Sequence, residues 1–366
     1  QGKIGSENER RRRIKEMYFL YKSQLYIEDL KQTLEQVEVC DRLKESAVLV
    51  AGASGLIGSF IVDLLLSANK YLKTNITVYA IGRSKKRLQE RFDGIETDRL
   101  LLIEQDINEP LEIDLPVDYI IHGASNAYPA AFRENPVDTI MSNILGTYHL
   151  LEYGRLHGGK RLLYVSSGEV YGQGSPAEEA FQENYSGYIN ILEPRSCYPS
   201  GKRAAETLCC SYYQQYGAEV VIARPCHTYG PNMSVKDNRA TAQFIGNALR
   251  GEDIVLKSSG SQLRSYCYVA DCVSALLTVL IKGSAGEAYN LANPDSRLTI
   301  AQFAQRVAEL SGHQLIFENP DPTALQERSP IDRQVLDSKK LETLGWKGKY
   351  DPEKGIRHTL KILGIG

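Results

Sequence analysis

From residue 47 onward, short apolar runs alternate with longer stretches of helical character. Runs of three to six mainly apolar residues are typical of strands buried on both faces of a parallel sheet. We assign strands to residues 47–51, 76–81, 100–103, 119–121, 162–165 and 220–223. Helical patterns follow most of them, for example at residues 61–66, 140–156 and 201–215. This alternation predicts an α/β fold, a doubly wound parallel sheet with right-handed crossovers.

The two ends of the chain have a different pattern. Residues 10–44 contain no Pro or Gly and carry apolar residues at near-helical spacing, which predicts an N-terminal helical extension packed on the core or on a partner subunit. The basic run Arg10–Arg13 is interpreted as a solvated helix start. Near Cys226 the alternation breaks into shorter pieces, which indicates a smaller lobe. The expected segments are 1–45, 46–225 and 226–366, with 269–283 returning to the sheet domain.

Composition and charge exclude several classes of protein. The 366 residues are 42% hydrophobic and 24% charged, enough apolar material for a sizeable core in one large or two moderate domains. A net charge of -2 gives no reason to expect binding to nucleic acid or to a membrane surface. No apolar run approaches the ~18 residues of a membrane span, and no secretory signal pattern is present. The seven cysteines lack metal-ligand spacing, so we expect reduced thiols, no metal and a cytoplasmic location.

A glycine motif connects the first predicted strand to the first predicted helix. The segment Gly52-Ala-Ser-Gly55-Leu-Ile-Gly58 follows the strand directly. Glycines permit a tight turn and a close approach of the backbone to a pyrophosphate, while a helix N-terminus offers free N–H groups and a favourable dipole. Strand, turn and helix occur in the required order, so the motif predicts a dinucleotide site on a Rossmann sheet.

The end of the second strand bears on which dinucleotide is bound. It reads Ala80-Ile-Gly82-Arg83-Ser84-Lys85 and lacks the carboxylate that binds the ribose 2′-hydroxyl of NAD. Arg83 and Lys85 would suit the 2′-phosphate of NADP, or would be solvated loop residues. NAD and NADP both remain open on these residues, and Asp106, after the third strand, is a candidate partner for the adenine.

Two further segments carry candidate catalytic groups. Tyr198 and Lys202 are four residues apart and so lie on one face of a helix, where an ammonium would lower the pKa of a phenol that removes a proton from a substrate hydroxyl. Ser167 and Glu169 follow the fifth predicted strand, at the edge of the sheet where ligands bind. The hydroxyl of Ser167 would bridge the substrate and the tyrosine. For Glu169 three interpretations stay open: a base, a group that orients substrate, or a turn cap.

The segments 52–58, 166–172, 198–202 and 224–231 together resemble the extended short-chain dehydrogenase/reductases that modify nucleotide sugars, the NAD-dependent epimerase/dehydratase family. The resemblance covers the chain from about Ala47 onward. It implies a nucleotide-sugar substrate, tightly held NAD(P) and transient oxidation at the sugar C4. Residues 46–225 would then be the NAD(P)-binding domain and residues 226–366 mainly the substrate-binding lobe. Segments 122–125, 197–206, 229–233 and 260–269 are most similar to UDP-glucuronate decarboxylases.

The resemblance also implies which residues have which roles. The catalytic set is Ser167, Glu169, Tyr198 and Lys202. Besides Tyr198 and Lys202, the residues expected to bind the cofactor are Gly52, Ser54, Gly55, Leu56, Ile57, Gly58, Arg83, Asp106, Ile107, Gly123, Ala124, Ser125, Asn143, Ser166, Arg224 and Pro225. The residues expected to bind the substrate are Ser125, Ser167, Gly168, Glu169, Tyr198, His227, Asn232, Arg239, Arg264 and Arg333. A homodimer is implied as well, joined through the helices at 140–156 and 201–215.

Several residues depart from the family patterns. Gly168 stands where 4,6-dehydratases carry the acid that protonates the leaving hydroxyl, which disfavours dehydration. Glu169 fits a simple 4-epimerase less well, because that position usually holds a small residue or Thr. Asn232 and the Gly82-Arg83 strand end differ from the usual decarboxylase residues. A 4-epimerase and an NADPH-dependent 4-keto-sugar reductase therefore remain alternatives to the decarboxylase.

Overall fold

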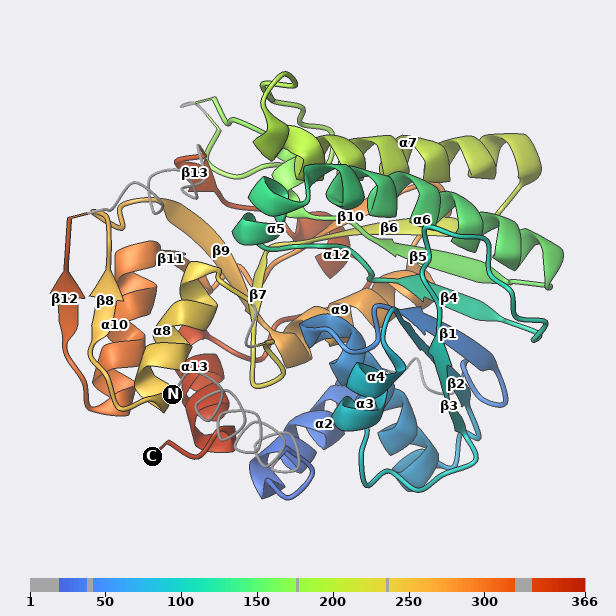
Figure 1. Cartoon of the computed structure of the whole chain (residues 1–366), viewed down its shortest axis with the longest axis horizontal. Coiled ribbons are helices and arrows are strands. Elements are labelled where there is room, and N and C mark those ends of the chain that lie inside the picture. The colour runs from blue at the N-terminus through green and yellow to red at the C-terminus, as the bar shows by residue number, and fades with distance from the viewer. Residues whose placement is uncertain (1–19, 38–41, 176–177, 235–236, 320–330, 366) are drawn as a thin grey trace, which may run out of the picture.

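A seven-stranded parallel sheet forms the larger part of the molecule in the computed structural model (Figure 1), which describes residues 20–37, 42–175, 178–234, 237–319 and 331–365. The strands lie in the spatial order β10 (Ala288–Leu291), β6 (Val220–Pro225), β5 (Arg161–Val165), β4 (Tyr119–His122), β1 (Ala47–Ala51), β2 (Thr77–Gly82) and β3 (Leu100–Glu104). The chain runs outward from β1 to β3 and then in the other direction from β4 to β10. The predicted doubly wound sheet is thus confirmed, with its switch point between β1 and β4.

Side-chain alternation on the buried strands separates the core into two layers. In β1, Val48 and Val50 pack with the helices on one face, and Leu49 and Ala51 belong to the cluster on the other face. All four are fully buried. A strand that is covered on both faces must be apolar at every position, which is why these strands read as continuous apolar runs.

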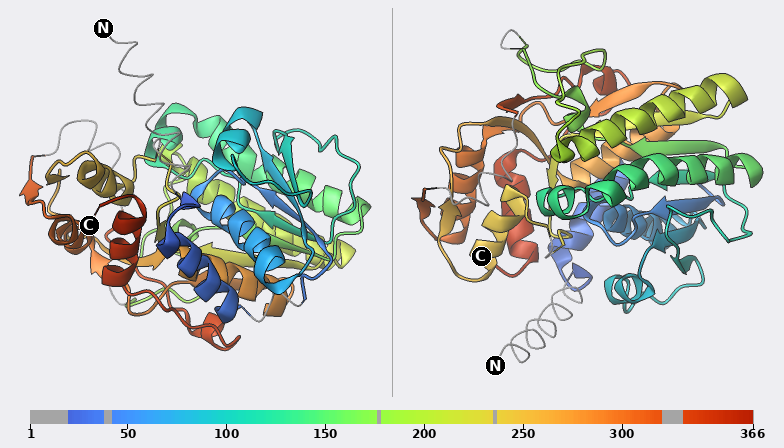
Figure 2. Two further views of the ribbon diagram at one scale, coloured as in Figure 1. Left: turned by 90° about the horizontal axis from the view of Figure 1, so that it is seen from below. Right: turned by 45° about the horizontal axis from the view of Figure 1, so that its top comes forward.

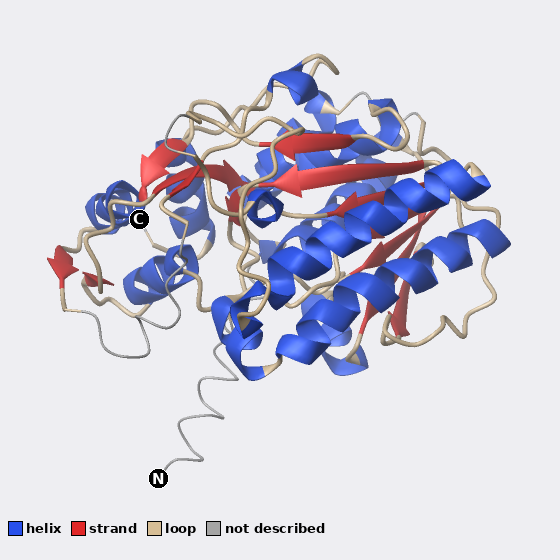
Figure 3. Ribbon diagram, turned by 90° about the horizontal axis from the view of Figure 1, so that it is seen from above, coloured by secondary structure: helices blue, strands red, loops and turns tan. Residues whose placement is uncertain are grey.

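Long helices cover both faces of the sheet. α3 (Leu56–Leu72) and α9 (Val269–Lys282) pack on one face. α6 (Pro136–Leu156) and α7 (Cys197–Tyr216) lie side by side on the other (Figure 3). α7 begins four residues earlier than the pattern predicted, so Tyr198 lies in its first turn, and it ends at Gly217, which has a positive φ of 66°. No helix in the described ranges has both the length and the apolar character needed to cross a membrane.

A smaller lobe lies beyond the carboxyl edge of the large sheet. Its main sheet combines β7 (His227–Tyr229), β9 (Leu263–Tyr268), β11 (Arg297–Thr299) and β13 (Arg333–Gln334), and a second pairs β8 (Ile254–Leu256) with β12 (Leu315–Phe317). The helices of this lobe are α8 (Ala240–Leu249), α10 (Ile300–Ser311) and α13 (Pro352–Ile362). Besides α9, the strand β10 also returns to the large sheet, and the short helix α12 (Lys339–Glu342) packs near it.

The described part of the N-terminal segment contains one helix, α2 (Gln24–Gln36), which packs against α3, α9 and α13 (Figure 2). Its Asp29 is fully buried and accepts hydrogen bonds from the hydroxyls of Tyr268 (2.6 Å) and Tyr350 (2.8 Å). The imidazole of His358, on α13, lies 2.8 Å from the same carboxylate. The basic run Arg10–Arg13 lies outside the described residues.

A second buried carboxylate joins α2 to the large domain. Asp63, on α3, accepts hydrogen bonds from Tyr21 (2.7 Å) and Tyr26 (2.5 Å) and forms an ion pair with Arg91 of α4 (Lys85–Arg91). The hydroxyl of Tyr26 accepts a further hydrogen bond of 3.0 Å from Asn232, which follows β7 of the smaller lobe. Because α2 bonds to both lobes, it is a bridge between them.

The Asp63 cluster leads to a prediction about stability. Asp63→Asn keeps the side-chain shape but leaves the guanidinium of Arg91, which is 5% exposed, without its counter-charge. We expect the free energy of unfolding to fall by about 3–5 kcal/mol, measured by guanidinium denaturation. Glu134→Gln is the control, because the Arg133–Glu134 pair is exposed and should contribute less than about 1 kcal/mol. Equal losses for the two variants would contradict the role given to this cluster.

Candidate active site

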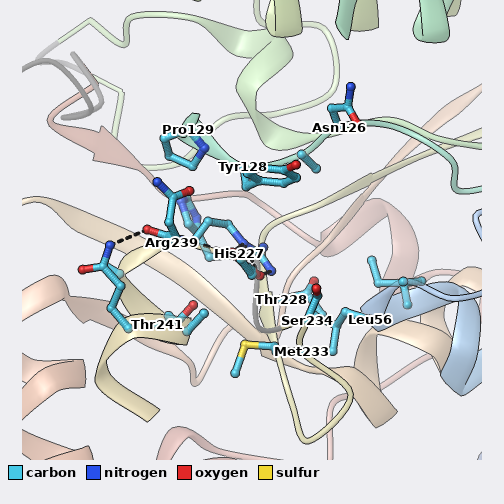
Figure 4. A pocket seen from close by; sticks show the side chains of 18 of the residues that line it. Leu56, Asn126, Tyr128, Pro129, His227, Thr228, Met233, Ser234, Arg239 and Thr241 are labelled. Carbon is cyan, nitrogen blue, oxygen red and sulfur yellow. Dashed lines mark hydrogen bonds and ion pairs between the residues drawn. The ribbon is translucent and has the colours of Figure 1, made fainter. Parts of the chain in front are cut away.

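A cleft of about 2040 Å³ opens at the carboxyl ends of the strands in the large sheet and extends to the smaller lobe. It lies where β1 and β4 diverge, which is the usual ligand position in a doubly wound sheet. Residues from both lobes line it. Figure 4 shows Tyr128 and Pro129 of the larger domain facing His227 and Arg239, which belong to the smaller lobe.

The glycines of the first turn allow the backbone of the turn to pack closely against its neighbours. Gly52 has a positive φ of 82°, and a Cβ on it would lie 2.8 Å from the backbone of Ala124. A Cβ on Gly58 would lie 2.3 Å from the carbonyl oxygen of Gly52. Gly55 precedes α3 and offers no side-chain cap, so the first N–H groups of that helix remain available to an anion. This cradle fits a dinucleotide pyrophosphate.

Buried polar atoms without hydrogen-bond partners also indicate that the cleft binds a ligand. The hydroxyls of Ser125 and Ser166, Nδ1 of His227 and Oδ1 of Asn232 have no hydrogen-bond partner within the described residues. All four residues line the cleft. Since buried polar groups are normally hydrogen-bonded, a polar ligand that reaches from the large sheet to the smaller lobe would satisfy them.

All the site residues predicted from the sequence line this cleft except Asn143, Arg224 and Arg333. The guanidinium of Arg224 donates hydrogen bonds to both carboxylate oxygens of Glu206 (2.9 and 2.6 Å). Successive side chains on a strand point to opposite faces, and Pro225 is the one that lines the cleft. Asn143 is buried and donates to the carbonyl of Thr139 (2.7 Å). Arg333 is exposed and donates to the carbonyl of Glu178 (3.5 Å). Their predicted ligand contacts are therefore not supported by these positions.

Tyr198 and Lys202 occupy successive turns of α7 at the end of β5. The ammonium of Lys202 donates a 2.7 Å hydrogen bond to the carbonyl of Val165, the last residue of β5. It also lies 4.7 Å from the ring centre of Tyr164 and 5.8 Å from that of Tyr198. Because Lys202 is only 2% exposed, burial lowers the pKa of its ammonium to about 7.

The pKa of the Tyr198 phenol differs from the sequence-based expectation. Burial and the nearby carboxylate of Glu169 raise this pKa to about 12, although a hydrogen bond with Ser167 lowers it. Spacing along the helix reveals the neighbouring ammonium but not the loss of water around the phenol. Burial thus opposes ionisation of the Tyr198 phenol, while the charges of Arg239 and Arg195 favour it.

Arg195 lines the cleft but was not among the site residues predicted from the sequence. Both terminal nitrogens of its guanidinium contact the carboxylate of Glu169, at 3.0 and 3.1 Å. The guanidinium stacks 4.6 Å from the ring centre of Phe132, and that ring in turn stacks on Tyr198 at 4.7 Å. Arg195 precedes Tyr198 by three residues, so an arginine close before the catalytic tyrosine was the available signal. The ion pair with Arg195 fixes the carboxylate of Glu169. Its backbone belongs to a short 3-10 turn, Gly168–Tyr171.

Three cationic or basic side chains form the smaller lobe's side of the cleft. Arg239 makes a bidentate contact with Asp237, with Nε 2.9 and 3.0 Å from the two carboxylate oxygens. Arg264 is buried and donates to the carbonyl oxygens of Ile331 (2.5 Å) and Asp332 (3.1 Å). Burial, together with these two arginines, lowers the pKa of His227 to about 3. The two guanidinium groups are donors of the kind that a diphosphate requires.

Comparisons with known proteins agree with this geometry. The model of the NAD dependent epimerase/dehydratase family matches residues 48–292. UDP-glucuronic acid decarboxylase 3 of Arabidopsis thaliana is 38% identical over 84% of the chain and 86% of its own length. UDP-glucuronic acid decarboxylase 1 of Xenopus tropicalis is 35% identical over 91% of the chain and 77% of its own length. The solved structure of UDP-glucose 4-epimerase from Thermotoga maritima superposes with a TM-score of 0.72, at 24% identity over 86% of the chain and 98% of its own.

The chain therefore belongs to the NAD-dependent epimerase/dehydratase family. The resemblance stated from its motifs is confirmed, as is the prediction of an NAD-dependent nucleotide-sugar enzyme. No group of three or more His, Cys, Asp or Glu side chains in the described ranges is arranged to hold a metal ion.

His122, next to the site, leads to a prediction about acid stability. Neither ring nitrogen has a partner among the described residues, and burial and then Lys202 lower its pKa to about 3. The unfolded chain has a histidine pKa of ~6.5, so between these values only the unfolded state is protonated. The stability contributed by neutral His122 is full above pH ~6.5 and falls as the pH drops toward 3, by up to about 1.4 kcal/mol per pH unit.

We expect His122→Asn to remove this part of the pH slope when urea unfolding is followed from pH 7 to pH 4. The difference from the unmodified protein isolates His122 from other groups that titrate in the same range. His149→Asn is the control, because His149 is half-buried and hydrogen-bonded to the carbonyl of Ile107 (2.9 Å). An unchanged slope in His122→Asn would show that this ring is protonated in the native state.

Proposed function

We propose that the enzyme decarboxylates UDP-glucuronate to UDP-xylose through transient oxidation at C4 of the sugar. The observation that carries this proposal is the bidentate contact between Arg195 and Glu169 beside Tyr198. Its guanidinium already binds one carboxylate, and a C6 carboxylate of the substrate is the same chemical group. An arginine fork matches a carboxylate with two parallel hydrogen bonds. The decarboxylases that are 33–38% identical to the chain support the proposal.

Two features support decarboxylation over the related reactions. Gly168 stands beside Glu169 and has no side chain, so this position carries no acid to protonate a leaving C6 hydroxyl as dehydration requires. Epimerisation or 4-keto reduction of a sugar without a C6 carboxylate needs no cation at that position, whereas Arg195 supplies one. These features disfavour the 4,6-dehydratase and a 4-epimerase or 4-keto-sugar reductase for such sugars, and the product formed from UDP-glucuronate distinguishes decarboxylation from epimerisation.

The cofactor site has a simple role in this reaction. The family uses NAD(H), and the cradle of Gly52, Gly55 and Gly58 would hold its pyrophosphate, with Asp106 near the adenine. When bound, the dinucleotide accepts a hydride from C4 and later returns it, so no cofactor is consumed. Lys202 lies where it would bind the nicotinamide ribose, and Ser125 and Ser166 bring their unpartnered hydroxyls to the same region.

The protein's own residues would act in sequence. Tyr198 takes the proton of the C4 hydroxyl, and Ser167, hydrogen-bonded to it, lies between phenol and substrate. In the resulting C4 ketone the C5–C6 bond breaks, CO₂ leaves, and its electron pair forms an enolate on O4. Tyr198, now a phenol, donates a hydrogen bond to that oxygen. C5 takes up a proton, and reduction at C4 completes UDP-xylose, so one CO₂ is released for each proton consumed.

Assembly and location are part of the same proposal. Tyr148 of α6 and Tyr213 and Tyr216 of α7 are 43, 43 and 51% exposed, although they are large and partly apolar. These two neighbouring helices would pair with the same helices of a second copy and form a homodimer. Cys209 is buried and Cys210 is exposed at this helix. The six cysteines of the described residues are free thiols, which supports a cytoplasmic location.

Incubating the purified enzyme with UDP-glucuronate and following products by proton NMR tests this function. We expect UDP-xylose and CO₂ in equal amounts, without accumulation of reduced cofactor. Tyr198→Phe should lower kcat by about 10²–10⁴-fold while leaving dinucleotide binding intact, because it removes only the proton acceptor. Formation of the C4 epimer instead of a pentose, or an active Tyr198→Phe variant, would contradict the proposal.

Arg195 gives a second, more specific prediction. Arg195→Gln should weaken binding of UDP-glucuronate about 10–100-fold, because a charge-assisted carboxylate contact is worth about 1.5–3 kcal/mol. Binding of UDP-glucose, which has no carboxylate, should stay within about twofold, and so its calorimetric titration is the matched control. If both ligands lose affinity equally, Arg195 supports the fold of the site and does not recognise C6.

A further inference from the structure

The end of β2 lacks the group that recognises the adenosine ribose of NAD. In dinucleotide-binding sheets this strand usually ends in a carboxylate, which accepts hydrogen bonds from the ribose hydroxyls and repels a 2′-phosphate. Here β2 ends at Gly82, and a side chain there would point toward Leu88, 3.3 Å from the Cβ position. The strand end thus offers the ribose neither a hydrogen-bond acceptor nor a negative charge.

Two arginines line the cleft immediately after this strand end. Arg83 donates a 3.1 Å hydrogen bond to Oδ1 of Asn126, which follows β4. Because β1 and its glycine turn lie between β2 and β4, the guanidinium reaches across the groove at the adenosine end of the cradle. Arg87, in the first turn of α4, also lines the cleft.

The charges around these two arginines leave them available to a ligand. No carboxylate of the described residues pairs with either guanidinium. The nearby Glu104 directs an oxygen to the backbone N–H of Lys85 (3.1 Å). Ser84 lies between the arginines, lines the cleft and carries a hydroxyl that already accepts from the N–H of Arg87 (3.4 Å), so its O–H is free to donate.

We propose that the cleft prefers NADP(H) to NAD(H), with the adenosine 2′-phosphate bound by Arg83 and Arg87 and hydrogen-bonded by Ser84. The two guanidinium groups match the doubly charged phosphate in charge and in donor geometry. This inference rests on the dinucleotide site of the proposed function, but on none of the reaction chemistry. The family's named cofactor is NAD, so the preference is a property of this chain's own residues at the end of β2.

Binding measurements on the whole enzyme test the preference without any turnover. The nucleotide retained on purification is released with acid and identified by chromatography, and NADP⁺ and NAD⁺ are then titrated calorimetrically into the protein freed of nucleotide. We expect retained NADP(H) and at least a ~10-fold tighter Kd for NADP⁺. Retention of NAD(H) alone, or equal Kd values, would overturn the proposal.

Variants assign the preference to particular residues. Arg83→Ala should weaken NADP⁺ binding about 10–100-fold and leave NAD⁺ within about twofold, because only the 2′-phosphate contact is lost. Lys86→Ala is the control, since this exposed lysine of α4 does not line the cleft, and it should change neither affinity. Equal weakening of both dinucleotides in Arg83→Ala would overturn the assignment.

The two proposals fail separately. If UDP-glucuronate is not turned over but NADP⁺ binds preferentially through Arg83, only the reaction is wrong. If the protein decarboxylates UDP-glucuronate with retained NAD and binds both dinucleotides equally, only the cofactor preference is wrong.

Discussion

Burial of a phenol and an ammonium side by side, at the end of β5, is the constraint on which the chemistry depends. The carbonyl of Val165 fixes the Lys202 ammonium, and the packing of α7 on the sheet leaves Tyr198 almost no contact with water. Lost solvation holds the pKa of the phenol near 12 and lowers that of the ammonium to about 7. Burial therefore opposes the charged form of both groups, and the neighbours of the phenol decide how far that effect is offset.

The cleft requires both lobes, and the helix α2 helps to hold them together. Its Asp29 accepts hydrogen bonds from β9 and from the segment before α13, while its Tyr26 contacts Asp63 on the other lobe. Asn232 joins the same network through Tyr26 and through Ser59 (3.0 Å). Asn232, which departs from the usual decarboxylase pattern, thus has a structural role, because it hydrogen-bonds to Tyr26 of the N-terminal helix α2.

Much of the architecture could be predicted from local patterns, because a strand buried on both faces must be apolar and a phosphate cradle must contain glycine. β1 was predicted with its observed bounds, and Gly52 and Gly58 have the close contacts that the motif implies. The errors come from long-range geometry. Arg224 points away from the cleft toward Glu206, and the partnership of Arg195 with Glu169 depends on a loop whose path the sequence does not encode locally. The pKa of Tyr198 was expected to fall because spacing shows the neighbouring ammonium but not the burial.

The central claim is that hydrogen leaves C4 of the sugar and returns to it within one catalytic cycle. UDP-glucuronate labelled with deuterium at C4 tests this most directly, with the product analysed by mass spectrometry and NMR. The account predicts slower turnover of the labelled substrate and UDP-xylose that keeps its deuterium at C4. A product that has lost the label to solvent, or CO₂ release that is insensitive to it, would contradict transient oxidation at that carbon.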